Sequence, residues 1–186
     1  MTPFQLREAV RALHRGGVIA YPTEAVYGLG CDPLNHDAVL RLLNLKQRPM
    51  DKGLILVAAE FSQLAPYLLP LAAALAQQVH AGWPGPVTWL LPVRPDVPRW
   101  LRGAHDTLAV RISAHPVVHA LCAAYGGPIV STSANPAGCR PARDALTVRR
   151  MFGAHLDAIL HAPLGGLDRP TEIRDGRNGR VVRAGQ

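Results

Sequence analysis

The sequence predicts an α/β fold, because short apolar runs typical of buried strands alternate with segments of helical periodicity. Apolar runs occupy residues 18–21, 54–57 and 128–130, and each of them directly follows glycine. Helical patterns at 37–45 and 116–125 lie between these runs. Alternation of strand and helix is typical of a sheet covered by helices, so we expect a single α/β sheet.

Composition is that of one ordinary globular domain spanning residues 1–186. The chain is 48% hydrophobic and 18% charged, with no linker-like shift in composition. No apolar run approaches the roughly 18–20 residues of a membrane span, and the N-terminus has no signal-peptide layout. The three cysteines show no CxxC spacing, so neither a disulfide framework nor a zinc site is expected. We therefore expect a cytoplasmic protein without membrane contact.

The charge balance favours an anionic partner. A net charge of +7 and a pI near 10.0 suit either a nucleic acid or a polyphosphate. Only two of the 20 basic residues are lysines, and both, Lys46 and Lys52, lie in one short stretch with Arg48. An ammonium is a compact point charge that suits phosphate oxygens. The alternative is that these cations merely complement the dipole at a helix C-terminus.

The first third of the chain begins with a helix and a strand. Thr2 is a candidate N-cap with Gln5 closing a capping box, and Gly16 with Gly17 ends that helix. The strand at 18–21 leads into residues 22–32, which we expect to be a loop with hydroxyl, carboxylate and glycine groups. Loops at strand C-termini are common ligand sites in open α/β sheets. The next helix, 37–45, cannot continue past Pro49.

The middle of the chain predicts scaffold helices within 61–81 and a rigid Gly/Pro-rich turn at 82–88 that feeds a strand at 88–91. The next strand, 108–112, carries Arg111 within an apolar run. A buried guanidinium needs an anion, so its partner is either a carboxylate of the protein or a carboxylate of a substrate.

The last third contains the densest run of hydroxyl groups. After the helix ending at Tyr125 and the strand 128–130, residues 131–138 read Ser-Thr-Ser-Ala-Asn-Pro-Ala-Gly, a loop of small polar side chains that a nucleotide could approach closely. The alternative is a simple Ser/Asn turn. The tail predicts strands at 156–161 and 172–175, and a turn before a short strand that ends at Arg183. Most of its other arginines are expected to face solvent.

Several common catalytic arrangements are missing from the sequence. It contains no GxxxxGK[ST] loop, no GxSxG elbow and no HExxH motif. Its 13 acidic residues do not cluster, so we expect no metal site built from protein ligands. Any Mg²⁺ would arrive bound to nucleotide phosphates.

Taken in order, a set of short motifs resembles the YrdC-like family of threonylcarbamoyl-AMP synthases, in its compact bacterial TsaC type. The matching segments are Tyr-Pro-Thr-Glu at 21–24, Tyr-Gly-Leu-Gly at 27–30, Leu-Lys-Gln-Arg-Pro at 45–49, Asp-Lys-Gly at 51–53, Trp-Pro-Gly-Pro-Val-Thr at 83–88, Val-Arg at 110–111, Ser-Thr-Ser-Ala-Asn at 131–135 and Pro-Thr-Glu-Ile-Arg-Asp at 170–175. The family's KxR and SxN pairs are Lys46/Arg48 and Ser133/Asn135. The additional C-terminal domain of longer relatives is not expected here.

The resemblance implies a twisted, open mixed sheet flanked by helices, with a large, positively charged concave groove. It implies an enzyme, a nucleotidyltransferase, that converts L-threonine, bicarbonate or CO₂, and ATP to threonylcarbamoyl-adenylate and pyrophosphate. ATP is then a substrate, with Mg²⁺ held through its phosphates. A partner transferase complex would move the threonylcarbamoyl group to tRNA, next to the anticodon.

The resemblance also implies roles for ten residues. Lys46 and Arg48 are the expected catalytic residues. The expected ATP-binding residues are Lys46, Arg48, Lys52, Ser133, Asn135 and Arg183. The expected L-threonine-binding residues are Thr23, Arg111, Ser131 and Thr171. This chain departs from the common family pattern at Ala25 and Ala137, which lack a hydroxyl, and at Gly53, where proline is frequent.

Two other functions compete with the synthase. A noncatalytic RNA-binding module, with direct RNA or tRNA binding, would explain the net charge and the arginine-rich tail. It would not explain the hydroxyl-rich segment or Arg111. A hydrolase using Ser131 would need a nucleophile elbow and a paired histidine, which the sequence does not supply.

Overall fold

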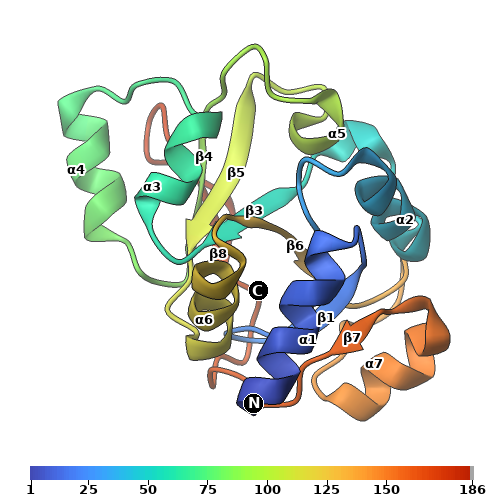
Figure 1. Ribbon diagram of the computed structural model, residues 1–186. Helices are drawn as coiled ribbons and strands as arrows, with labels where there is room; N and C mark the ends of the chain where they lie inside the picture. The colour runs from blue at the N-terminus through green and yellow to red at the C-terminus, as the bar shows by residue number, and fades with distance from the viewer. Residues whose placement is uncertain (185–186) are drawn as a thin grey trace.

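The computed structural model describes residues 1–184, which form one nine-stranded open sheet with helices on both of its faces (Figure 1). The helices are α1 (Pro3–His14), α2 (His36–Lys46), α3 (Phe61–Leu64), α4 (Ala73–Ala81), α5 (Arg99–Arg102), α6 (Pro116–Tyr125) and α7 (Ala145–Phe152), with short 3-10 turns η1 (Met50–Lys52), η2 (Ala65–Tyr67) and η3 (Gly153–His155). The strands are β1 (Ile19–Pro22), β2 (Tyr27–Gly30), β3 (Ile55–Ala58), β4 (Val87–Pro92), β5 (Thr107–Ile112), β6 (Ile129–Ser133), β7 (Ala158–Ile159), β8 (Glu172–Asp175) and β9 (Val181–Arg183).

The sheet is mixed, as expected. Its order is β7-β1-β2-β6-β3-β5-β4-β8-β9, so β6 enters between β2 and β3, which precede it in the chain. The pairs β1/β7, β3/β5 and β4/β8 are parallel, and the other neighbours are antiparallel. The predicted α/β class is confirmed.

Alternating side chains divide the core into two layers. Ile19, Tyr21 and Val57 pack with α1 and α6, which lie side by side on one face of the sheet (Figure 1). Ala20 and Leu56 point to the other face, where they join the larger cluster beneath α2 and α7. Because successive strand residues alternate between faces, the apolar runs seen in the sequence serve both layers at once.

The expected loop at 22–32 is only partly a loop. Residues Tyr27–Gly30 form β2, which pairs antiparallel with β1 and with β6. A Cβ added at Gly30 would lie 2.5 Å from the carbonyl oxygen of Val130 and 2.8 Å from the ring of Tyr21. The glycine therefore permits β2 to lie close to its neighbouring strands. In the sequence, a glycine with this role looks the same as a glycine that marks a turn.

Two strands have other bounds than the sequence predicted, and two helices were not predicted. The hydroxyl-rich segment begins inside β6, which runs to Ser133, so its first hydroxyls lie on a strand and only the rest forms a turn. Neither α5 nor α7 was predicted; the N-cap of α7 is Asp144, whose side chain accepts a hydrogen bond from the backbone of Thr147. The predicted strand at 156–161 is confined to β7.

Within residues 1–184, no helix is long and apolar enough to cross a bilayer.

Candidate active site

The sheet face that packs against α1 and α6 becomes polar farther along the same strands. Val57 and Ile129 belong to that apolar layer. Ser131 follows Ile129 by two residues on β6 and so shares its face, and Arg111 on β5 is the registered partner of Val57. At this boundary a cavity of about 420 Å³ opens. The site is thus the part of the face that helices leave uncovered.

The cavity collects nearly all of the predicted site residues. Nine of the ten line it: Thr23, Lys46, Arg48, Lys52, Arg111, Ser131, Ser133, Thr171 and Arg183. The tenth, Asn135, is not a lining residue but forms hydrogen bonds with Lys46 and Ser133, which are. Residues that are far apart in the sequence therefore share one groove, although none of the short motifs is distinctive alone.

Lys46 joins the two halves of the predicted phosphate site. It is the last residue of α2 and is only 6% exposed. Its Nζ donates to Ser133 at the carbonyl oxygen (2.6 Å) and at Oγ (3.2 Å), and to Asn135 at the carbonyl oxygen (3.0 Å) and at Oδ1 (3.1 Å). The Ser133 hydroxyl also donates to Asn135 Oδ1, at 2.6 Å. The KxR and SxN pairs are in direct contact.

The electrostatic setting of Lys46 is unusual for a lysine. Burial, and then the nearby guanidinium of Arg48, lower the pKa of its ammonium from 10.5 to about 8. Its four acceptors are all neutral oxygens, so none of them balances the charge. A bound anion would restore that balance.

Arg48 shapes the loop that follows α2. Its Nη2 and Nε donate to the carbonyl oxygen of Gly53 at 2.9 and 3.2 Å, and Nη2 also reaches the carbonyl of Lys52 at 3.3 Å. Gly53 has a φ of +62°, which proline cannot adopt. Lys52 is exposed at the mouth of the cavity. The departure from proline at position 53 therefore matches the backbone of this loop.

Arg111 has a carboxylate of the protein as its partner. Its Nη2 lies 3.4 Å from Oε2 of Glu24, and each of these two residues is 5% exposed. Its Nη1 donates to the hydroxyls of Thr171 (2.7 Å) and Thr88 (3.3 Å). Glu24 Oε1 accepts from the hydroxyl of Ser113 at 2.6 Å. Of the two alternatives left by the sequence, the structural carboxylate is present.

One donor of Arg111 is unpaired. Within the part of the chain that the structure describes, Arg111 Nε and Glu24 Oε2 are buried without a hydrogen-bond partner. Buried polar atoms in native proteins are usually paired, and an unpaired one costs stability. Because Arg111 lines the cavity, the pair can still engage a ligand.

Thr171 connects the tail of the chain to this network. Its hydroxyl accepts from Arg111, and its carbonyl oxygen accepts from Nη2 of Arg183 at 3.1 Å. This contact connects the end of β9 to the lining of the groove. Thr23 is 7% exposed, and its hydroxyl donates to the carbonyl oxygen of Val26 at 2.7 Å. Ser131, 5% exposed, lies on the cavity wall.

Three relevant residues were not predicted from the sequence. Glu24 was expected only as the carboxylate of a loop. A buried Arg111 needs an anionic partner, and this need was the signal in the sequence that pointed to a carboxylate such as Glu24. Arg102 and His105 line the cavity beside α5, a helix that was not predicted, and nothing in the sequence pointed to them. Within residues 1–184, no three His, Cys, Asp or Glu side chains come together as a metal site.

Comparisons with known proteins find relatives over nearly the whole chain. The sequence model of the Sua5/YciO/YrdC family, described as telomere recombination, matches residues 11–185. The threonylcarbamoyl-AMP synthase of Halorhodospira halophila is 60% identical over 181 residues, covering 97% of this chain and 95% of that protein. The synthase of Nitrosococcus oceani is 56% identical over 180 residues, with 97% of each chain covered.

Solved structures show the same fold. A structure of P. abyssi Sua5 complexed with L-threonine superposes with a TM-score of 0.92 at 31% identity, and covers all of this chain. This chain spans 55% of that longer protein. The structure of E. coli YciO gives a TM-score of 0.85 at 28% identity, covering 97% of this chain and 90% of YciO.

Proposed function

The chain belongs to the Sua5/YciO/YrdC family, its activity is threonylcarbamoyl-AMP synthesis, and we propose that it joins L-threonine, bicarbonate or CO₂, and ATP in the groove described above. The observation that carries this proposal is the 60% sequence identity with a synthase over nearly the whole chain, together with the contact of Lys46 with Ser133 and Asn135. The product is threonylcarbamoyl-adenylate, and pyrophosphate is released.

The groove has the charge that ATP requires. Among residues 1–184, six basic residues and no carboxylate line it: Lys46, Arg48, Lys52, Arg102, Arg111 and Arg183. A concentration of one sign of charge in a concave site attracts the opposite charge and stabilises it there. Lys46, Arg48 and Lys52 hold the phosphates, Ser133 and Asn135 contact the nucleotide, and Arg183 closes over it. Mg²⁺ enters bound to the phosphates, and Lys46 and Arg48 stabilise the charge that develops at the α-phosphate.

Arg111 marks the threonine end of the groove. Its guanidinium, which lines the cavity, is the donor for the substrate carboxylate, with Thr23, Ser131 and Thr171 as neighbouring hydroxyl contacts. A guanidinium suits a carboxylate because its donors form a planar fork. Glu24 holds the guanidinium in place and limits the net charge at the threonine site.

The chemistry then needs mainly positioning. The threonine nitrogen, as the free amine, forms a bond to the carbon of CO₂ while one C–O π bond opens onto oxygen. The nitrogen then loses a proton to water, which gives an anionic carbamate. A carbamate oxygen forms a bond to the α-phosphorus of ATP, and the bond to the bridging oxygen breaks as pyrophosphate leaves. Since the nucleophile is already an anion, this step requires no strong base from the protein. Alignment and charge stabilisation supply the catalysis.

The defining test is pyrophosphate release by the purified protein with L-threonine, bicarbonate, Mg²⁺ and ATP. Release that depends on both threonine and bicarbonate is expected. We further propose that a partner transferase complex consumes the adenylate to modify tRNA. The RNA-binding alternative predicts steeply salt-dependent RNA binding and no turnover even with the partner proteins present, and that outcome would replace the synthase.

Affinity for ATP should fall as the pH rises above about 8. Lys46 has its pKa lowered to about 8 in the ligand-free protein, so its ammonium loses its proton through this range. The neutral amine no longer attracts phosphate, and the dissociation constant should rise by up to about tenfold per pH unit. Equilibrium titration with ATP alone, from pH 7 to 10, measures this dependence. The Lys46→Met variant is the control, and an equally steep rise in that variant would exclude Lys46 as the titrating group.

Replacing Thr171 by valine should raise the KM for L-threonine by roughly ten- to hundredfold, because Arg111 would lose its shortest hydrogen bond. Thr171→Ser keeps the hydroxyl and serves as the matched control, with a KM close to that of the parent. Steady-state kinetics with saturating ATP separates KM from kcat. If the valine variant changed only kcat, Thr171 would not position the threonine site.

A further inference from the structure

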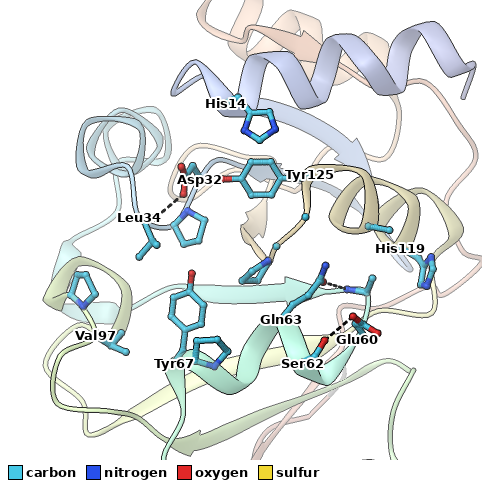
Figure 2. A pocket seen from close by; sticks show the side chains of 18 of the residues that line it. His14, Asp32, Leu34, Glu60, Ser62, Gln63, Tyr67, Val97, His119 and Tyr125 are labelled. Atoms are coloured by element: carbon cyan, nitrogen blue, oxygen red, sulfur yellow. Dashed lines mark hydrogen bonds between the residues drawn. The ribbon is translucent and has the colours of Figure 1, made fainter.

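A second and larger cavity, of about 980 Å³, lies at the other ends of the strands that form the groove (Figure 2). Asp32 follows β2, Ala59 follows β3 and Pro128 precedes β6, and all three line this cavity. The groove is lined by residues from the opposite ends of the same strands. The two cavities share the central sheet but, within residues 1–184, no lining residue, so the second one is separate from the proposed active site.

The charge of this second cavity is opposite to that of the groove. Asp32, Glu60 and Asp96 line it, and no lysine or arginine of the described residues does, although the chain as a whole carries +7. Asp96 pairs with Arg94 at 3.1 Å. Neither Asp32 nor Glu60 forms an ion pair with any residue in the described range 1–184. The cavity is therefore an acidic region in a basic protein, and two of its carboxylates have no cationic partner among residues 1–184.

A tyrosine hydroxyl points into the same cavity. Tyr67 is only 8% exposed, and its ring rises from η2 so that the hydroxyl faces the open space (Figure 2). That hydroxyl forms no hydrogen bond to any of residues 1–184, and burial and the charge of Asp32 raise its pKa. The ring is held by its burial, whereas the hydroxyl is open to the cavity. Its orientation supplies a polar contact for a ligand.

Aromatic rings complete the cavity wall. The ring of Tyr125 packs on the imidazole of His14 with centroids 4.9 Å apart, and its hydroxyl points toward Asp32 (Figure 2). Pro33, Val97 and Pro128 form apolar surface around these groups. Aromatic faces next to a carboxylate are the arrangement that attracts ammonium and guanidinium groups.

We propose that this second cavity binds an organic cation, an ammonium or guanidinium group, with the Asp32 carboxylate and the Tyr67 hydroxyl as acceptors and Tyr125 as an aromatic wall. The cation is either a free polyamine or a basic side chain of another protein, since the chemistry of recognition is the same. This inference does not depend on the synthase activity, because it uses no residue of the groove.

The test is calorimetric titration of the nucleotide-free protein at low salt with two probes, spermidine and the peptide Gly-Arg-Gly. At least one probe should bind. Asp32→Asn should weaken that binding by about tenfold, and Tyr67→Phe should weaken it by a smaller factor. The matched control is Asp37→Asn, which removes the same charge from a fully exposed side chain outside the cavity. It should bind the probe as the parent does.

The variants are chosen to fold. Asp32 now accepts a hydrogen bond from the Leu34 backbone amide at 2.8 Å, and the carboxamide introduced by Asp32→Asn keeps an oxygen for that bond. Tyr67→Phe keeps the buried ring, and unchanged melting temperatures would verify both variants. Tighter binding of spermidine identifies a polyamine as the ligand class, and tighter binding of the peptide identifies a protein side chain. Failure of both probes to bind, or equal binding by Asp32→Asn and the parent, would overturn the proposal.

Discussion

Lys46→Ala should lower kcat/KM for threonine-dependent pyrophosphate release by tens to several hundredfold. This corresponds to roughly 2–4 kcal/mol of transition-state stabilisation, the amount typically lost with one charge-assisted contact. The variant removes the ammonium together with its four hydrogen bonds to Ser133 and Asn135. Single-turnover formation of the adenylate, measured at saturating ATP, reports the chemical step directly.

Lys52 is the natural control for this experiment. It is the other lysine of the chain and lines the same groove, but it is exposed. Lys52→Ala should therefore cost several-fold less than Lys46→Ala, because water screens an exposed charge. Equal losses in the two variants would mean that the burial of Lys46 is irrelevant to its role. Adenylate formation at the parental rate by Lys46→Ala would contradict the phosphate assignment.

Glu24→Ala should destabilise the protein by about 3–5 kcal/mol, the usual cost of leaving one member of a buried ion pair without its partner. Glu24 and Arg111 are each 5% exposed, and Glu24 also accepts from Ser113. Urea unfolding of the parent and the variant measures the difference in the free energy of unfolding. Glu8→Ala, which removes a carboxylate from an exposed i,i+3 pair with Arg11, is the surface control and should change stability by less than about 1 kcal/mol.

A double-mutant cycle separates the structural role of this pair from its functional role. Arg111→Met combined with Glu24→Ala removes both charges and should recover part of the stability lost in Glu24→Ala. The same double variant should bind L-threonine no better than Arg111→Met alone, because the proposed carboxylate donor is missing. Recovery of threonine binding together with stability would show that Arg111 is a purely structural cation.

Much of the local structure could be predicted because it depends on neighbouring residues. The capping box of Thr2 and Gln5 begins α1, as predicted, because the two side chains satisfy each other's backbone amides. The core strands were likewise visible as apolar runs. The glycines of β2 misled the prediction, because a glycine required for close packing between strands and a glycine required in a turn look alike in a sequence.

From the sequence alone we predicted the fold class, the family resemblance and nine residues that line one groove. The partners of these residues became visible in the folded chain: Glu24 for Arg111, and Ser133 and Asn135 for Lys46. The contacts of Lys46 join residues 87 and 89 positions apart, which meet because β6 enters the sheet between β2 and β3. The acidic cavity around Tyr67 also depends on long-range packing. Local patterns specify helices and strands, whereas charge pairing and cavities depend on which strands become neighbours.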